Sequence, residues 1–502
     1  MDESAGTWTN VTSDIQLVRH LLDLYFCWEY PTLASLSKEH FYKDFEEGRQ
    51  RYCSSLLINA LLALGSRFCN RLEVRGNPDD PYTAGDRFFQ EAQRLFWELE
   101  EYNELTVIQA LGIMAIREAS CGRDFESRYY AGQSVRLAIE TGLHRADSYH
   151  VDNDEFSKVR LQTFWGAFAL DNAWSITTGA LPHFSRMPRL PPKIRPIPEV
   201  ENALWTPYTD DGLALEHSCE QPCHIITVYN CFCELSQIVH SSLYRIHCVA
   251  RKATSQDILG IYAKYISWYD NLPETLRLGS NFTPQVLFTH LYYHFAIVLT
   301  FRPFIEFRIR GSEIVPRELC LQAANTIQTH LKAYSRLYSL RRTPSFVPYV
   351  VLVSSRVYVS LTTAGSATIP RSPPSRVNEH IKDALRCNIA TLDDMAACHR
   401  AALIGANMLR YMSTALKIYI GIRDHNPQLQ QVSASTAGGP DLFASSSSSF
   451  SGMATSGAAL GESAVLDDEE PLQRALSWPA PRQTPSMVPH ESKLEEAGFE
   501  SW

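Results

Sequence analysis

Residues 106–147 read TVIQALGIMAIREASCGRDFESRYYAGQSVRLAIETGLHRAD, and they hold two helix patterns separated by a glycine. In the first pattern, apolar residues recur at three- and four-residue spacing, as Ile108, Leu111 and Ile116 illustrate. This is the period of an amphipathic helix. We therefore predict a helix that starts at residue 106 and ends near Gly122.

The second helix of this stretch is predicted over 129–141. It closes at Gly142, because glycine readily adopts the left-handed conformation that ends a helix, and Leu143 stands where the accompanying apolar contact forms. His144 follows, where a histidine can satisfy the last carbonyls and favour the helix dipole. We favour this capping role over catalysis, because no nucleophile or paired acid lies nearby in the sequence.

The same helical period extends outward from Asp14 to about Tyr419, and strand-like alternation is rare. Asp14 or Ser13 can cap the first helix, and several later patterns begin with proline, which suits a first helical turn. The fold class is therefore all-α, with one large multi-helix domain. One further helix is predicted from Ile15 until Pro31 stops it. The others are predicted over 56–64, 86–96, 158–177, 223–250, 256–271, 284–301, 316–338, 344–363, 376–396 and 399–422.

Two segments break the helical pattern. The run MPRLPPKIRPIPEV holds five prolines, so an extended crossover is predicted over 187–198. From Asp424 onward, Ser, Ala, Gly, Pro and acidic residues dominate, and such a segment cannot bury enough apolar surface to fold. The chain thus divides into a flexible N-terminus (1–13), a helical domain (14–423) and a disordered acidic tail (424–502).

Composition excludes several classes of protein. The chain has 502 residues, 45% of them hydrophobic, and a net charge of -9, of which the tail carries most with 11 acidic and 3 basic residues. Direct DNA binding is disfavoured because there is no overall basic field. The start MDESAGTWTN is no export signal, and charges interrupt the apolar stretches before roughly 18 residues, so we expect no membrane span. The 12 cysteines suggest reduced, buried thiols rather than disulfides in an intracellular protein.

Five segments in a fixed order resemble the fungal-specific transcription factor domain, also called the middle homology region, of fungal zinc-cluster transcription factors. The resemblance extends roughly over 15–307 and is greatest to the nitrate-assimilation and xylanolytic activator type. The segments are SSLLINALLALGSRF (54–68), GDRFFQEAQRLF (85–96), the opening stretch (106–147), VRLQTFWGAFALDNAWSITTGALPHF (159–184) and YYHFAIVLTFRPFIE (292–306).

The resemblance assigns family-motif positions to nine residues. The chain departs from the family at one of them, because the Gly-Arg-Pro turn is replaced here by Gly179-Ala180-Leu181-Pro182. Asp171 lies in an apolar helix, where a carboxylate needs a partner such as an arginine, so a structural ion pair is predicted and ligand contact is the alternative. The nine positions are Gly122, Gly142, Leu143, His144, Trp165, Asp171, Gly179, Arg302 and Pro303.

A second departure concerns zinc. Members of the family usually begin with six cysteines that bind two zinc ions and contact DNA, and no such spacing occurs in this sequence. Either the chain is a truncated gene product, or it acts without its own DNA contact. Two zinc ions are therefore expected only with an upstream six-cysteine module, and DNA is a partner only through that module.

Cysteines and histidines cluster between residues 217 and 248. Zinc prefers four nitrogen or sulfur ligands, usually as two close pairs. Cys231 and Cys233 would point to different faces of a helix, so we interpret the cluster as core cysteines and surface histidines, with no metal site. Its members are His217, Cys219, Cys223, His224, Cys231, Cys233, His240, His247 and Cys248.

Paired acids at 79–80, 210–211 and 393–394 raise the alternative of a terpene-cyclase-like enzyme with a magnesium site. We favour solvated surface, because the first two pairs lie in loops and the third lacks a further acid at helical spacing. There is also no phosphate-binding loop, dinucleotide fingerprint or Gly-x-Ser-x-Gly elbow. No catalytic residue is therefore assigned.

In the tail, AVLDDEEPLQRALSW (464–478) alternates acids with apolar residues. Such alternation keeps anchors exposed for a partner groove, and a plain solvated tail is the alternative. The candidate activation anchors are Leu466, Leu472, Leu476 and Trp478.

Together these observations favour a non-enzymatic nuclear regulator of RNA polymerase II transcription, acting on metabolic or biosynthetic genes. The helical domain would sense a small molecule, and the tail would recruit transcription machinery or co-regulators. A cytoplasmic location and a homodimer stay open. The alternatives are the all-α enzyme and a DNA-independent interaction scaffold.

Overall fold

The computed structural model describes residues 8–30, 32, 35–146, 149, 155–184, 189–212, 220–247, 253–364, 374–416 and 499–501. These residues form fifteen α-helices and two short antiparallel strand pairs, so the all-α prediction is confirmed. Across these ranges, no helix is both long and apolar enough to cross a bilayer.

The first half of the chain folds into seven helices, and all but α4 end within a few residues of a glycine or proline. The predicted Asp14 cap of the first helix forms, since its carboxylate accepts the N–H groups of Gln16 and Leu17. The helices are α1 (Ile15–Trp28), α2 (Lys38–Glu47), α3 (Ser55–Gly65), α4 (Asp86–Trp97), α5 (Leu105–Ser120), α6 (Asp124–Glu140) and α7 (Glu155–Thr178).

Helix α6 ends as its sequence predicts. Gly142 has a φ of 74°, the Leu143 N–H donates to the Ala138 carbonyl at 2.9 Å, and the Gly142 N–H donates to Ile139 at 3.0 Å. These two bonds define the Schellman motif, and Leu143 is buried beneath it.

The second half begins with the short helix α8, which follows the proline-rich crossover. Prolines stand in the first turns of α8, α11 and α12 and fix where these helices start. The helices are α8 (Pro198–Glu201), α9 (Ile225–His247), α10 (Ser255–Asp270), α11 (Pro284–Phe301), α12 (Pro316–Tyr338), α13 (Val347–Ala364), α14 (Pro374–Met395) and α15 (Arg400–Ala415).

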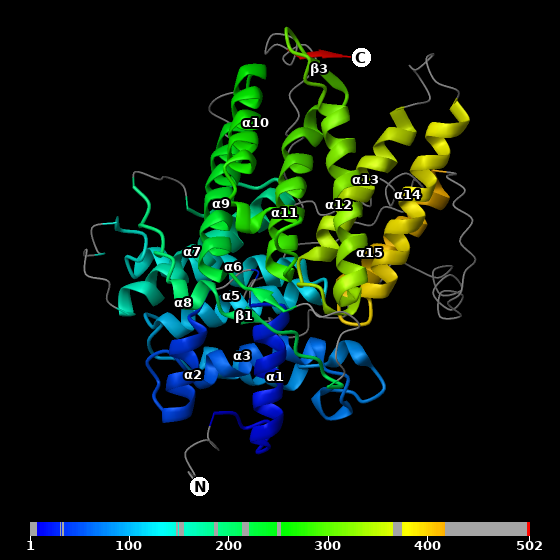
Figure 1. Ribbon diagram of the computed structural model, residues 1–502. Coiled ribbons are helices and arrows are strands. Elements are labelled where there is room, and N and C mark those ends of the chain that lie inside the picture. The colour runs from blue at the N-terminus through cyan, green and yellow to red at the C-terminus, as the bar shows by residue number, and fades with distance from the viewer. Residues whose placement is uncertain are drawn as a thin grey trace, which may run out of the picture.

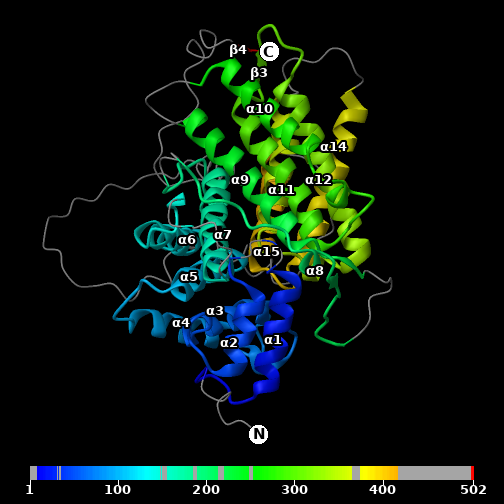
Figure 2. The ribbon, with the colours of Figure 1, turned by 60° about the vertical axis from the view of Figure 1, so that its left-hand side comes forward.

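The helices lie in three tiers, which Figures 1 and 2 show from two sides. Helices α1 to α4 lie at the bottom, α5 to α7 cross the middle, and α9 to α14 rise above them as a bundle.

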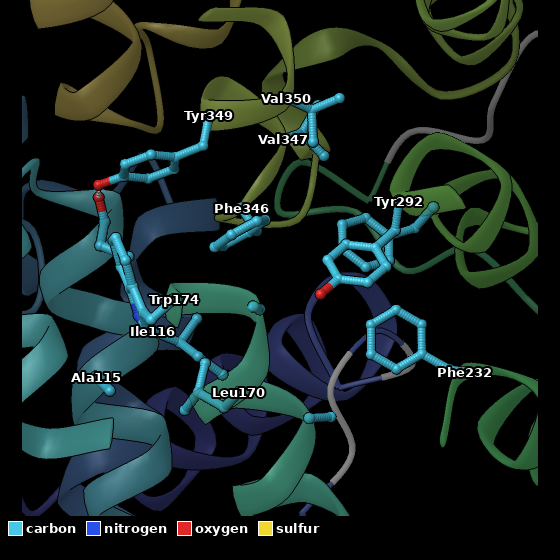
Figure 3. Packing of buried hydrophobic residues seen from close by; sticks show 14 of the residues in the cluster. Ala115, Ile116, Leu170, Trp174, Phe232, Tyr292, Phe346, Val347, Tyr349 and Val350 are labelled. Atoms are coloured by element: carbon cyan, nitrogen blue, oxygen red, sulfur yellow. Dashed lines mark hydrogen bonds between the residues drawn. The ribbon is translucent and has the colours of Figure 1, made fainter. Parts of the chain in front are cut away.

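One apolar core connects the tiers. In Figure 3, Trp174 from α7 meets Phe346 and Tyr349 at the start of α13, with ring centroids 5.9 Å and 5.2 Å apart. Phe346 also contacts Phe295 of α11 at 5.7 Å. Because the first and second halves share these contacts, residues well beyond the best-matching segment contribute to the same core.

Four features differ from the expectations. Helix α6 begins at Asp124 rather than at residue 129. Helix α2 was not anticipated because only Phe41 and Phe45 give it a strong apolar face. The helix expected from residue 223 begins at Ile225, since the preceding residues form strand β2 (Gln221–Pro222), which pairs with β1 (Leu204–Trp205).

The fourth concerns the tail. Residues Phe499–Ser501 form strand β4, which pairs with β3 (Phe307–Ile309) through backbone bonds that composition does not reveal. The predicted disorder of 424–498 lies outside the described residues.

Candidate functional site

A cleft of about 910 Å³ opens between the bottom tier and the proline-rich crossover. Helices α1 and α2 form one side, and the other consists of the start of α7, the crossover, β1 and the start of α9. Its size is in the range of small-molecule sites. The crossover, which the prolines keep extended, therefore serves as one wall of a cavity.

Aromatic rings form much of the wall. Trp205 packs edge-on against Trp28 at 5.6 Å and against Tyr338 at 5.3 Å, and its indole N–H donates to the Cys27 carbonyl at 3.4 Å. The Tyr229 hydroxyl donates to the Gln162 carbonyl at 2.7 Å. Because these rings are fixed from several sides, the wall is largely pre-formed.

Charged groups stand at the edge of this wall. The Lys38 ammonium lies 5.3 Å from the Phe26 ring centroid and 5.9 Å from that of Tyr42, within the range of a cation–π contact. Tyr42 donates its hydroxyl to Asp23 at 2.8 Å. The cleft thus offers an apolar body and a few oriented polar ends, which suits a small metabolite.

The thiols of the cleft are poor nucleophiles. Burial raises the pKa of Cys27 to about 12 and also raises the pKa of Cys223 above its usual value. A reactive cysteine needs the thiolate, which these surroundings disfavour.

A serine–histidine–acid sequence also lies on the rim. His40 Nδ1 is 2.7 Å from the Ser37 hydroxyl, and its Nε2 is 3.5 Å from Glu155. The Glu155 side chain is 68% exposed, so water competes for it. We interpret the Ser37–His40 bond, which spans one turn at the start of α2, as a local helix-end interaction.

Beside the cleft, His20, Cys69 and Asp210 bring three potential metal ligands within 4.8 Å of one another. Both ring nitrogens of His20 are already bonded, to the Tyr208 hydroxyl and to Asp210, each at 2.8 Å. Burial raises the pKa of Cys69 to about 12. The trio therefore acts as a latch that holds the loop before residue 212 against α1. Sequence reasoning missed it because its members lie far apart in the chain.

Comparisons with known proteins identify a domain family for this chain. Residues 22–270 match the fungal specific transcription factor domain, a range that holds nearly all of the cleft lining. The chain belongs to this family. No solved structure matches it.

Two relatives are similar over most of the chain. The nitrogen assimilation transcription factor nirA of Emericella nidulans is 34% identical over 374 residues, which cover 72% of this chain and 42% of nirA. The nitrogen assimilation transcription factor nit-4 of Neurospora crassa is 35% identical over 364 residues, which cover 69% of this chain and 33% of nit-4.

A more distant relative is the notoamide biosynthesis transcriptional activator notL' of Aspergillus versicolor, 24% identical over 307 residues that cover 59% of this chain and 47% of that protein. The chain thus spans less than half the length of these three relatives.

Among the family-motif positions, Asp171 is predicted to form an ion pair with a partner such as an arginine. The structure places His183 there instead of an arginine, with Nδ1 2.7 Å from one carboxylate oxygen and the backbone N–H donating to the other at 2.9 Å. This bond raises the pKa of His183. A Cβ at Gly132 would lie 2.9 Å from the histidine ring, so that glycine makes room for it.

The other motif positions shape the scaffold. Gly122 has a φ of 72°, and a Cβ there would lie 2.6 Å from Ile404. The buried Trp165 donates its indole N–H to the Pro192 carbonyl at 3.3 Å and so ties α7 to the crossover. The His144 ring lies 5.9 Å from that of Phe184, and its predicted capping role stays a prediction.

Gly179, Arg302 and Pro303, from two segments far apart in the sequence, line one small cavity. None of its lining residues borders the cleft.

The cysteine–histidine cluster lies only partly in the described residues, which exclude His217, Cys219 and Cys248. Cys231 and Cys233 are buried on α9, and Cys223 lines the cleft. No described member of this cluster joins a group of three potential metal ligands.

In each acid pair, at least one carboxylate bonds to another group of the protein. Asp80 accepts the Tyr82 N–H at 2.9 Å, Asp210 belongs to the latch, and Asp393 pairs with Arg410 at 2.5 Å. The prediction that these acids are simply solvated surface residues is therefore incomplete, because one acid of each pair bonds to another group of the protein. The activation anchors Leu466, Leu472, Leu476 and Trp478 lie outside the described residues.

Proposed function

We propose that the protein is a non-enzymatic regulator of RNA polymerase II transcription that acts in the nucleus on metabolic or biosynthetic genes. The similarity to nirA and nit-4 over about 70% of the chain carries this proposal. A binding role is also consistent with the raised thiol pKa values and the pre-formed aromatic wall of the cleft.

The cleft would hold the effector of this regulator. A small metabolite with an apolar body would pack against Trp205 and Tyr229, and its polar end would meet Lys38 or Asp23. Occupation would stabilise one arrangement of the crossover over another, because a ligand shifts an equilibrium only through its differential affinity for two states. The tail would recruit the transcription machinery through its apolar anchors.

DNA contact would come from a six-cysteine module with two zinc ions rather than from the helical domain. The full chain lacks an overall basic field, which phosphate contacts require.

A reporter assay tests the proposal. The full chain is fused to an unrelated DNA-binding domain and placed on a promoter with intermediate basal output, so that activation and repression are both visible. We expect output to differ from that of the DNA-binding domain alone, and K38M to change it by up to about fivefold, since a cation–π contact contributes about 1 kcal/mol. The matched control K264M, at an exposed lysine of α10, should leave it unchanged.

Output equal to that of the DNA-binding domain alone would remove the regulator proposal. Equal output from K38M and the wild type would remove the effector role of the cleft. In a third arm, alanines at Leu466, Leu472, Leu476 and Trp478 should lower activation, and unchanged output would remove the anchor role.

A further inference from the structure

Two arginines of the upper bundle have a buried guanidinium nitrogen and no carboxylate partner within the part of the chain that the structure describes. Arg302 follows the last residue of α11, and Arg356 lies in the middle of α13, where it is 8% exposed. The Nη1 atom of each guanidinium is buried and has no hydrogen-bond partner among the described residues. Within the same ranges, neither arginine forms an ion pair with an acidic side chain.

The two charges also oppose each other. Burial lowers the pKa of both guanidinium groups, and the charge of Arg302 lowers the pKa of Arg356 further. Arginine nevertheless stays protonated in proteins. Both guanidinium groups therefore stay charged in a poorly solvated region and repel each other, an arrangement that is unfavourable unless an anion lies nearby.

A cavity lies beside Arg302. It measures about 80 Å³ and is lined by Arg302, by Gly179 and by the end of α9 with His247. A water molecule occupies about 30 Å³ in the liquid, so the cavity has room for an anion of a few heavy atoms.

A second polar side chain without a partner lines the same cavity. The Nδ1 atom of His247 is buried and has no hydrogen-bond partner among the described residues. The neighbouring hydroxyls of Thr177 and Thr178 already donate to carbonyls of α7, at 2.6 Å and 2.8 Å. The groups that remain for a ligand are thus a guanidinium and an imidazole.

We propose that this cavity binds a small oxyanion, held by Arg302 and His247, with the positive charge of Arg356 adding to the attraction. A guanidinium presents a planar fork of N–H donors that matches two oxygens of a carboxylate, phosphate or sulfate. His247 would donate its Nδ1–H to a third oxygen. The site is separate from the cleft and does not depend on the regulator proposal.

Thermal unfolding of the full chain tests this site. Phosphate, sulfate and acetate are each titrated from 0 to about 20 mM, with sodium chloride keeping the ionic strength constant. For at least one of them we expect a saturable rise in Tm of about 2–4 °C, because a ligand that binds only the folded state stabilises it by mass action. Phosphate and sulfate also stabilise proteins by exclusion, but that effect does not saturate in this range.

The variants R302M and H247N should lose the saturable rise, R356M should shift it to higher anion concentration, and R336M, at an exposed arginine of α12, should keep it. A response to acetate alone would indicate a carboxylate ligand, and a response to phosphate and sulfate alone a tetrahedral one. The proposal would be overturned if none of the three anions gave a saturable response. It would also be overturned if R302M and H247N responded as strongly as the wild type.

Discussion

Arginines with buried guanidinium atoms occur in both halves of this protein, and Arg117 differs from Arg302 and Arg356 in its surroundings. Arg117 on α5, only 1% exposed, pairs with Asp86 and Glu118 and lies 4.2 Å above the Phe89 ring. Arg302 and Arg356 have no such carboxylates among the described residues. The first arrangement holds α4 against α5, whereas the second leaves positive charge unused by the fold.

The difference separates structural charge from binding charge. An arginine whose counter-charges come from adjacent helices has its charge balanced as soon as the chain folds. A buried arginine without a counter-charge lowers stability, and a bound anion would supply the missing charge. We therefore assign Arg117 to the scaffold and Arg302 to a site.

The largest effect is expected at Arg117. The variant R117M leaves Glu118, whose side chain is 3% exposed, with only the partly exposed Arg123 as partner. Breaking a buried pair in this way costs about 3–5 kcal/mol of unfolding free energy. Urea denaturation measures it, with R336M as the control, and a loss below about 1 kcal/mol would show that the pair is not structural.

A smaller effect is expected from pH. His290 and His294 of α11 lie next to His330 of α12. The ring centroid of His330 is 6.1 Å from that of His290 and 5.6 Å from that of His294. Burial lowers the pKa of His294 to about 3 and that of His330 to about 4. In the unfolded chain these histidines take up protons below about pH 6.5. Stability is therefore complete above pH 6.5 and is lost as the pH falls toward 4, by about 1–2 kcal/mol per histidine between pH 7 and pH 5.

Urea denaturation at several pH values checks this window. Other groups titrate in the same range, among them Glu29, whose pKa burial raises to about 7 and whose contribution has the opposite sign. The decisive quantity is thus the difference between the wild type and H294L or H330L. Parallel curves would contradict neutral histidines in this region.

The sequence predicts most of the helical scaffold because its signals are local. Prolines fix the starts of α11 and α12, and Gly142 fixes the end of α6 through a conformation that glycine adopts most easily. Helix α2 carries too few apolar residues to give such a signal.

The sites were less accessible from the sequence because they depend on tertiary neighbours. The cleft joins segments from α1 to α11, and the partner of Asp171 follows a turn whose family pattern is altered here. One signal was present, namely a single arginine, Arg356, inside the apolar run VLVSSRVYVS (351–360). A buried charge of this kind indicates either an ion pair or a ligand, and only the structure distinguishes the two.

The most direct test compares the unfolding free energies of R302M and R117M. The measurement is made without added oxyanions, and the pH buffer is kept at its lowest usable concentration. If Arg302 serves a ligand, R302M should be as stable as the wild type or more stable, because the substitution removes an unpaired buried charge. A loss for R302M as large as that of R117M would mean that both arginines serve the fold, and it would contradict the distinction drawn between the two regions.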